Sequence, residues 1–439
     1  MDLLPIPAPL IDGSWEGILD VGQKIRVIFH LVSTSDGLAA TVDSPDQGVT
    51  AVPSNATLDG SLLTVTVPVL GAQFQGTFSE DSSSVDGTLT QGGRSFPLTL
   101  ERGADVAASE PHRPQNPIRP YPYRDEDITY PNPVAGIELA GTLTIPPGSG
   151  PFPAVVLISG SGPQDRDESL LGHKPFLVLS DYLTRHSIAI LRSDDRGVGE
   201  SGGDRALATT NDFATDVEAA VAYLKTRPEV DAHGIGLIGH SEGGLIAPMV
   251  AARNQDIAFI VIMAGPGVPG EQIIVAHTVA CAKASGMSQE VAGSAGAQQR
   301  HILDLVQHES DEGELKKKLN AELHFPPEQF DHVYGQLTSP WYRSFLAYDP
   351  APALRNVTCP VLALIGEKDT QVPAGLNLPA IRNALQDGGN EHAEVVELPG
   401  LNHLFQHAET GAFAEYGKIE ETIAPEALEK IAAWIRQQS

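Results

Sequence analysis

The sequence contains few cysteines and few basic residues. Among its 439 residues only Cys281 and Cys359 carry thiols, which excludes a disulfide framework and a Cys-rich metal site. Lysine and arginine number 28 against 56 aspartates and glutamates, for a formal net charge of −28 at pH 7. Phosphate backbones bind proteins through Lys/Arg patches, and the one basic cluster is the Lys-Lys-Lys run at residues 316–318. We therefore expect no nucleic-acid partner.

Long hydrophobic runs are also missing. No apolar run reaches the roughly 18 residues that a membrane-spanning helix needs, so we expect no membrane insertion. Residues 1–13 show no basic start and no apolar core of a secretory signal. Hydrophobic residues make up 41% of the chain, which indicates a soluble globular protein. It could be cytoplasmic, or exported if a signal was removed before residue 1, and a homo-oligomer is compatible with the sequence.

The pattern of apolar residues divides the chain into two domains. Short alternating runs separated by Asp-Gly turns predict a small all-β domain, a barrel or a sandwich, over residues 1–105. Residues 106–124 are rich in proline and predict a stiff linker. Residues 125–439 alternate apolar runs with helical stretches, which predicts an α/β fold around a mostly parallel sheet. A strandless, polar helical stretch at about 270–338 predicts a cap inserted after a strand.

The most specific motif is the tight turn Gly-His-Ser-Glu-Gly-Gly that begins at Gly239. It follows an apolar strand and precedes a helix, which is the context in which Gly-x-Ser-x-Gly presents a nucleophile. We expect Ser241 to be that nucleophile and the N–H of Glu242, at the helix N-terminus, to donate to an oxyanion. The side chain of His240 is expected to point away from the site and to pack or hydrogen-bond locally.

A serine hydroxyl needs a histidine base and an acid that orients this histidine. Asp369 and His403 each follow an apolar strand after a short loop, as Ser241 does. Carboxyl ends of parallel strands meet at one edge of a sheet, so these three residues are expected to converge. Glu367 is an alternative acid, and His407 or His392 is an alternative base.

A second oxyanion donor is expected in the glycine-rich loop Ser-Gly-Ser-Gly-Pro-Gln-Asp at residues 159–165. The N–H of Ser161 is our first choice and that of Gly162 the second. A phosphate-binding loop is a weaker interpretation, because no lysine follows at the spacing of a P-loop. The run Asp-Asp-Arg-Gly-Val-Gly-Glu-Ser at residues 194–201 is interpreted as a turn scaffold near the site.

With these motifs in the order Ser, Asp, His, residues 128–437 resemble the α/β-hydrolase-fold serine esterases. The loop Ser-Gly-Ser-Gly-Pro-Gln-Asp-Arg-Asp narrows the resemblance to bacterial carboxylesterases of the dienelactone-hydrolase and prolyl-oligopeptidase-like branch, some of which carry an extra N-terminal domain. One departure is Ser159, since many relatives have His-Gly where this chain has Ser-Gly.

The resemblance implies hydrolysis of short acyl esters without a cofactor or metal. In this role Ser241 is the nucleophile, His403 the base and acid, and Asp369 its orienter. We expect Trp341 and Tyr342, with Gly162, to contact the small-molecule ester. The net charge of −28 favours neutral esters over anionic ones. A peptidase or acyl-aminoacyl hydrolase is the alternative, and an inert binding protein is disfavoured because every triad element is present.

Overall fold

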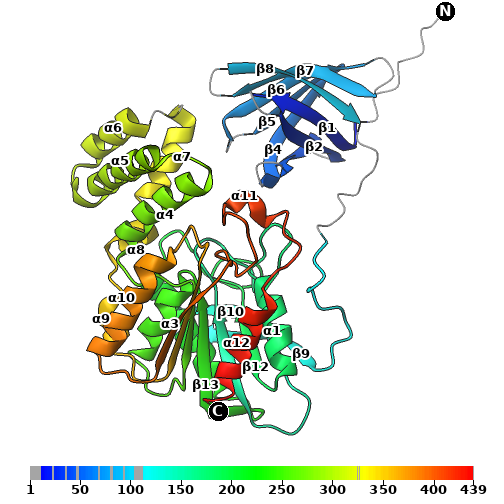
Figure 1. The fold of residues 1–439 in the computed structure, drawn as a ribbon. Coiled ribbons are helices and arrows are strands. Elements are labelled where there is room, and N and C mark those ends of the chain that lie inside the picture. The colour runs from blue at the N-terminus through cyan, green and yellow to red at the C-terminus, as the bar shows by residue number, and fades with distance from the viewer. Residues whose placement is uncertain are drawn as a thin grey trace, which may run out of the picture. The chain divides into compact units, whose positions relative to one another are not determined.

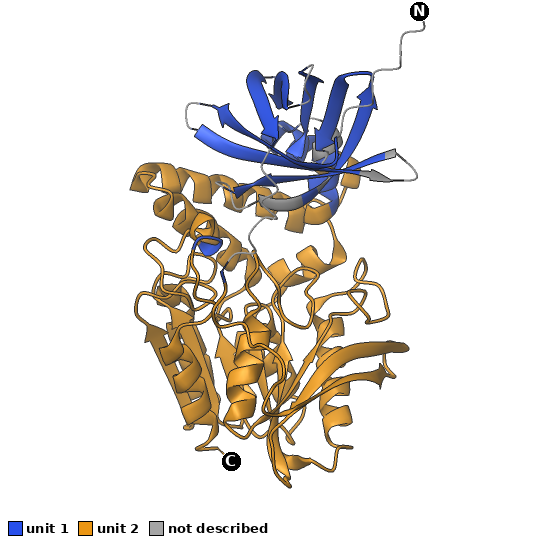
Figure 2. Ribbon diagram, turned by 90° about the vertical axis from the view of Figure 1, so that its right-hand side faces the viewer, with its two compact units in different colours: residues 1–112, 317–335, 416–418 blue, residues 113–316, 336–415, 419–439 orange. Residues whose placement is uncertain are grey.

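The computed structural model describes residues 11–21, 24–34, 37–45, 49–67, 70–79, 83–91, 94–102, 112–323, 325 and 327–438. They divide into two compact units, shown in Figure 2. The first comprises residues 1–112, 317–335 and 416–418, and the second comprises residues 113–316, 336–415 and 419–439.

The first unit contains a closed antiparallel barrel in which every strand pairs with its neighbour in the sequence (Figure 1). Pairing of Trp15 with Arg102 and of Glu16 with Glu101 joins the first strand to the last and closes it. The predicted all-β domain is confirmed, and it is a barrel rather than a sandwich. Its strands are β1 Gly13–Asp20, β2 Lys24–Thr34, β3 Gly37–Ser44, β4 Val49–Asp59, β5 Leu62–Val67, β6 Ala72–Phe78, β7 Ser84–Gln91 and β8 Arg94–Arg102.

Large apolar side chains fill the barrel. Burial alternates strictly along β6, as expected of a strand with one face inside. Trp15, Phe29 and Phe74 are fully buried, and the rings of Phe29 and Phe74 meet edge to face at 5.3 Å. The barrel therefore has its own hydrophobic core.

The second unit is built on an eight-stranded sheet with the order β16-β15-β14-β13-β11-β12-β10-β9. Strand β10 is antiparallel to both of its neighbours, and the other pairs are parallel. The expected mostly parallel sheet is confirmed, and the hairpin of β9 and β10 adds to the predicted strands. The bounds are β9 Arg124–Asn132, β10 Ile137–Ile145, β11 Phe152–Ile158, β12 Ala189–Ser193, β13 Val230–His240, β14 Ile260–Met263, β15 Val361–Gly366 and β16 Ala393–Leu398.

Helices cover both faces of this sheet. Val155 and Val156 on β11 show the consequence, because successive side chains enter the two different cores. A strand buried on both faces needs a continuous apolar run, which is the pattern that the sequence shows. One face packs against α1 Pro175–Arg185 and α12 Pro425–Ile435, which lie side by side in Figure 1. The other packs against α2 Thr210–Leu224, α3 Gly243–Ala251, α9 Ala351–Arg355 and α10 Ala374–Asp387, and a short helix, α11 Phe413–Tyr416, precedes α12.

The predicted insertion lies between β14 and β15 and is helical. Gly270, where the insertion begins, packs so closely on α8 that an added Cβ would lie 2.0 Å from the carbonyl oxygen of Phe345. None of the helices in the described ranges is long and apolar enough to cross a membrane. The inserted helices are α4 Gly270–Ala284, α5 Gln289–His308, α6 Glu312–Leu323, α7 Pro327–Leu337 and α8 Pro340–Ala347.

Part of the predicted proline-rich linker belongs to the second unit. Residues 106–111 lie outside the described residues. Beyond them, the guanidinium of Arg113 donates to the carbonyl oxygens of Ile419 and Leu171, each at 2.8 Å. The side chain of Gln115 donates to the carbonyl oxygen of Ile423 at 2.7 Å. From residue 113 on, the segment is therefore held by hydrogen bonds rather than behaving as a free spacer.

Candidate active site

Ser241 lies at a tight turn between β13 and α3 and has a left-handed backbone with φ of +54°. The chain passes itself closely here, since a Cβ on Gly239 would lie 1.9 Å from the carbonyl oxygen of Gly243. A Cβ on Gly243 would lie 2.1 Å from the carbonyl oxygen of Ile158. Only glycine fits at both positions, which explains the Gly-x-Ser-x-Gly spacing. The turn is the strained one that the motif predicts.

Asp369 and His403 form a buried pair. The Nδ1 of His403 donates to Oδ2 of Asp369 at 2.8 Å, and both residues are almost completely buried. The other carboxylate oxygen of Asp369 accepts from the backbone N–H groups of Gln371 and Val372, each at 2.8 Å. The carboxylate is thus fixed on both sides, and it fixes the imidazole in turn.

Ser241, Asp369 and His403 follow β13, β15 and β16, so all three lie at the carboxyl edge of the parallel strands. His240 links the serine turn to the histidine loop, because its Nε2 donates to the carbonyl oxygen of His403 at 3.0 Å. The two imidazole rings lie 4.8 Å apart. Within the described part of the chain, the hydroxyl of Ser241 makes no hydrogen bond to His403. The structure thus joins Asp369 to His403 and places Ser241 at the same edge of the sheet.

The alternative acid and bases have other surroundings. Glu367 is exposed and accepts from the backbone N–H of Gly400 at 2.8 Å. His407 is exposed and forms ion pairs with Glu421 and Glu426, each at 2.9 Å. His392 is exposed as well. These positions favour Asp369 and His403 for the site.

The glycine-rich loop after β11 lies against the serine turn. A Cβ added to Gly160 would lie 3.1 Å from the Cβ of Ser241, and the Gly160 N–H donates to Oε1 of Glu168 at 2.8 Å. The backbone N–H groups of Ser161 and Glu242 donate to no group among the residues that the structure describes. These two donors are therefore free to meet an oxyanion, whereas the Gly160 N–H is engaged.

A buried ion pair that no sequence motif indicates lies next to this loop. Oε1 of Glu168 also accepts from Nδ1 of His240 at 2.9 Å, and both side chains are buried. Burial by itself lowers the pKa of His240, but the charge and hydrogen bond of Glu168 and the carbonyl oxygen of His403 raise it above its ordinary value. Both ring nitrogens of His240 thus face an oxygen atom, one of the Glu168 carboxylate and the other of the His403 backbone. The expected local hydrogen bonding of His240 is wrong, because its two partners, Glu168 and His403, lie 72 and 163 residues away in the sequence.

Asp195 holds both ends of the same loop. Its carboxylate accepts from the hydroxyl of Ser159 at 2.6 Å and from the backbone N–H of Gln164 at 3.1 Å. The guanidinium of Arg205 pairs with it at 2.6 Å. This contact accounts for the departure at Ser159, whose short hydroxyl reaches the carboxylate. It also gives the predicted turn scaffold at residues 194–201 a particular task.

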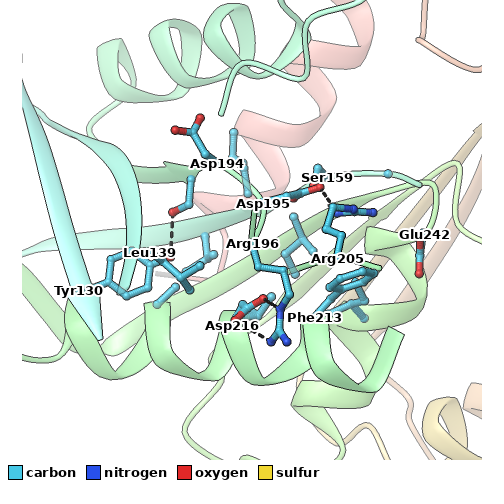
Figure 3. A pocket seen from close by; sticks show the side chains of 18 residues that line it. Tyr130, Leu139, Ser159, Asp194, Asp195, Arg196, Arg205, Phe213, Asp216 and Glu242 are labelled. Carbon is cyan, nitrogen blue, oxygen red and sulfur yellow. Dashed lines mark hydrogen bonds and ion pairs between the residues drawn. The ribbon is translucent and has the colours of Figure 1, made fainter. Parts of the chain in front are cut away.

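A pocket lies beside the glycine-rich loop (Figure 3). Its cavity volume is about 60 Å³. Gly160 and Glu242 line it, while Ser241, Asp369 and His403 do not. In Figure 3 the guanidinium of Arg196 reaches Asp216, to which it donates at 2.7 and 2.9 Å. The pocket thus shares a wall with the glycine-rich loop and with the turn that carries Ser241.

The residues expected to contact substrate have different positions. Trp341 on α8 reaches the serine turn, because its Nε1 donates to Oε1 of Glu242 at 2.8 Å. Tyr342 is mostly buried, and burial raises the pKa of its hydroxyl to about 12. Gly162 lies in the glycine-rich loop with φ of +96°, a conformation that suits glycine.

The described residues contain no candidate metal site. Across the described ranges, no three His, Cys, Asp or Glu side chains are gathered as a metal ion would require. Cys281 and Cys359 are free thiols.

Comparison with known proteins identifies the family. Residues 155–416, more than half of the chain, match the model of the alpha/beta hydrolase family. The chain therefore belongs to the alpha/beta hydrolase family. Its esterase and thioesterase relatives indicate that it is a hydrolase.

Esterase EstD of Thermotoga maritima is 28% identical over 322 residues, which cover 72% of this chain and 69% of that protein. Human acyl-coenzyme A thioesterase 1 is 31% identical over 135 residues, which cover 30% of this chain and 28% of the thioesterase. Among solved structures, the Pyrococcus furiosus esterase PF2001 is similar with a TM-score of 0.45 and 17% identity, over 72% of this chain and 91% of that one.

Proposed function

We propose that this protein is a serine hydrolase that cleaves short-chain carboxylic esters through an acyl-enzyme intermediate. The observation that carries the proposal is the buried hydrogen bond between Asp369 and His403, at the sheet edge where the half-buried Ser241 lies on its strained turn. A nucleophile, a base and an orienting acid from three separate strand ends are the elements that such a reaction needs.

In the acylation step, His403 removes the proton of Ser241 through Nε2 while the serine oxygen attacks the ester carbonyl carbon. Asp369 stays ionised and stabilises the imidazolium that forms. The carbonyl oxygen becomes an oxyanion, which the N–H groups of Ser161 and Glu242 stabilise. Collapse of the intermediate breaks the bond to the alcohol oxygen, and His403 returns its proton to the leaving alcohol.

Deacylation repeats these steps with water. His403 takes a proton from the water as it attacks the acyl carbon, and the same two N–H groups stabilise the second oxyanion. The bond to Ser241 then breaks, the serine regains its proton from His403, and the carboxylic acid leaves. Gly162, Trp341 and Tyr342 are proposed to contact the substrate during the cycle.

Covalent labelling tests this assignment directly. A fluorophosphonate probe is expected to add one phosphonyl group per chain, on Ser241, because only an activated serine attacks phosphorus at a useful rate. Peptide mass mapping of the full-length protein locates the adduct. Heat-denatured protein, in which the triad is dispersed, is the control and should stay unlabelled. An adduct on another residue, or none, would contradict the proposal.

Hydrolysis of thioesters is a second candidate, favoured by the 31% identity to human acyl-coenzyme A thioesterase 1. The net charge of −28 disfavours it for acyl-coenzyme A, whose phosphates are repelled by a strongly acidic protein. A panel that keeps one butyryl group separates the candidates: a p-nitrophenyl ester, a neutral N-acetylcysteamine thioester, acyl-coenzyme A and an aminoacyl amide. We expect the neutral ester to have the largest kcat/KM, and the amide, the peptidase substrate, the smallest.

The pH dependence of this reaction should reveal Asp195. Burial raises the pKa of Asp195 to about 6, against the opposing effects of the Ser159 hydrogen bond and the Arg205 charge, while the negative charge of Glu168 adds to the rise. Protonation below pH 6 weakens the ion pair with Arg205. It thereby loosens the glycine-rich loop at residues 159–165, which carries the proposed oxyanion donor Ser161. We expect log kcat/KM to fall more steeply on the acid side in the wild type than in the Asp195→Asn variant, which lacks this carboxyl group.

Unfolding would not explain that loss of activity. A raised carboxyl pKa means that the native protein binds more protons than the unfolded chain between about pH 4 and pH 6. The stabilising contribution of Asp195 is therefore present below about pH 4 and is lost as the pH rises through 6. Melting temperatures at pH 5 and pH 7 check this, and equal acid slopes in variant and wild type would reject the role of Asp195.

A further inference from the structure

Glu242 holds a particular place in the proposed site. It follows Ser241 directly and precedes the first residue of α3, and its backbone N–H is one of the two proposed oxyanion donors. Its side chain is only 2% exposed. A buried carboxylate is unfavourable unless hydrogen bonds satisfy it, so the partners of this side chain define what it does.

Those partners come from two helices outside the serine turn. Oε1 of Glu242 accepts from the hydroxyl of Thr210 at 2.7 Å and from Nε1 of Trp341 at 2.8 Å. Thr210 is the first residue of α2, and Trp341 lies on α8. No Lys, Arg or His side chain within the described ranges pairs with Glu242, unlike Asp195 and Glu168. Its position therefore depends on these two neutral donors.

Helix α8 connects Glu242 to the helical insertion. The indole of Trp341 stacks on Phe345 of the same helix, with ring centroids 5.5 Å apart and an interplanar angle of 18°. The backbone of Phe345 touches Gly270, the first residue of α4, so closely that no side chain fits there. Helix α8 also packs against α4 and α5. The side chain bonded to Glu242 thus belongs to a helix that packs against the start of the insertion.

We propose that Glu242 is a positioning residue through which helix α8 aligns the oxyanion hole. The hydrogen bond from Trp341 holds the Glu242 side chain, and this side chain orients the peptide N–H that meets the oxyanion. The inference rests on the proposed esterase mechanism. It follows that displacement of α8 lowers the rate of the chemical step more than it lowers substrate binding.

Single substitutions measure this link with p-nitrophenyl butyrate as substrate. Trp341→Phe removes the N–H donor, so kcat should fall by about tenfold. The change keeps an aromatic ring on Phe345, and with it the proposed contact with the substrate, so KM should stay within about twofold. This loss is smaller than the hundredfold or more expected when an oxyanion donor itself is removed. Thr210→Val removes the other donor and should lower kcat in the same direction.

Two Glu242 variants separate a hydrogen-bonding role from a packing role. Glu242→Gln retains an oxygen that accepts both hydrogen bonds, so kcat should stay within about threefold of the wild-type value. Glu242→Met has a similar length but no acceptor, and should lose about as much as Trp341→Phe. If Trp341 and Glu242 act through one hydrogen bond, the double variant that combines Trp341→Phe with Glu242→Met should be no slower than Glu242→Met alone.

Trp434→Phe is the matched control, since the same change is made in a buried indole on α12, which packs on Phe259 at the opposite face of the sheet. It should lower the melting temperature and leave kcat within about twofold. A wild-type kcat for both Trp341→Phe and Thr210→Val would overturn the inference and leave the esterase proposal intact. Additive losses in the double variant would overturn it too. A wild-type protein without turnover and without labelling at Ser241 would overturn the esterase proposal and this inference with it.

Discussion

Replacing Ser241 with alanine is expected to lower kcat for p-nitrophenyl butyrate by about 10⁵ to 10⁶-fold, because removal of a triad serine leaves only the oxyanion hole and binding. The fold should survive, since alanine and serine carry the same Cβ at the positive φ of +54°. Initial rates on purified full-length protein measure the loss, and an unchanged melting temperature shows that the variant is folded.

The control for this experiment is Ser169→Ala. Ser169 is an exposed serine that follows Glu168 and lies outside the glycine-rich loop at residues 159–165. The Ser169→Ala variant should keep the wild-type kcat. Fluorophosphonate labelling should disappear in Ser241→Ala and persist in Ser169→Ala. Retention of more than about one hundredth of the wild-type kcat by the Ser241 variant would mean that another group is the nucleophile.

The second large effect is expected from Asp369→Asn, with kcat reduced by about 10³ to 10⁴-fold. The physical reason lies in the two backbone N–H groups, of Gln371 and Val372, that bond one carboxylate oxygen. In the variant they require the amide oxygen, so the amide NH₂ is turned toward Nδ1 of His403. The imidazole must then carry its proton on Nε2, and it cannot accept the proton of Ser241.

Glu367→Gln provides the matched comparison, because it makes the same carboxylate-to-amide change in the alternative acid, which lies just before Asp369 in the same loop. Its exposed carboxylate bonds only to the backbone of Gly400 in the described hydrogen bonds, so kcat should remain within about twofold. Measuring kcat from pH 6 to pH 10 for both variants also tests the tautomer argument, since the Asp369 variant should regain part of its rate at high pH. The reverse order of effects would assign Glu367 as the acid.

The serine turn could be predicted from sequence because its causes are local. Gly239 and Gly243 are required by contacts within the strand, turn and helix that immediately surround Ser241. Asp369 and His403 could also be predicted from the sequence. Each follows an apolar run that ends in a loop, and parallel strands bring such ends to one edge of the sheet. A regular pattern along the chain therefore indicates these three residues without knowledge of the strand order.

The residues that support the site lack such a pattern. Glu168 meets His240 across 72 residues, Asp195 meets Ser159 across 36, and Trp341 meets Glu242 across 99. Each contact depends on which strands are neighbours and on where an insertion returns to the sheet. From sequence alone, a carboxylate in a loop is expected to be a solvated surface group. Only the tertiary structure shows that Glu168 and Asp195 form hydrogen bonds and ion pairs inside the protein.

The amino-acid sequence by itself thus determined the two fold classes and the chemical elements of the site, because hydrophobic periodicity and glycine sterics act over a few residues. Tertiary structure decided what depends on long-range pairing. The hairpins of the first domain suit a sandwich as well as a barrel, and the pairing of β1 with β8 through Trp15 and Arg102 closes the barrel. In the same way, the packing of α8 against α4, α5 and α2 decides that Trp341 bonds to Glu242, since a hydrogen bond between distant residues forms only where the fold brings donor and acceptor within about 3 Å.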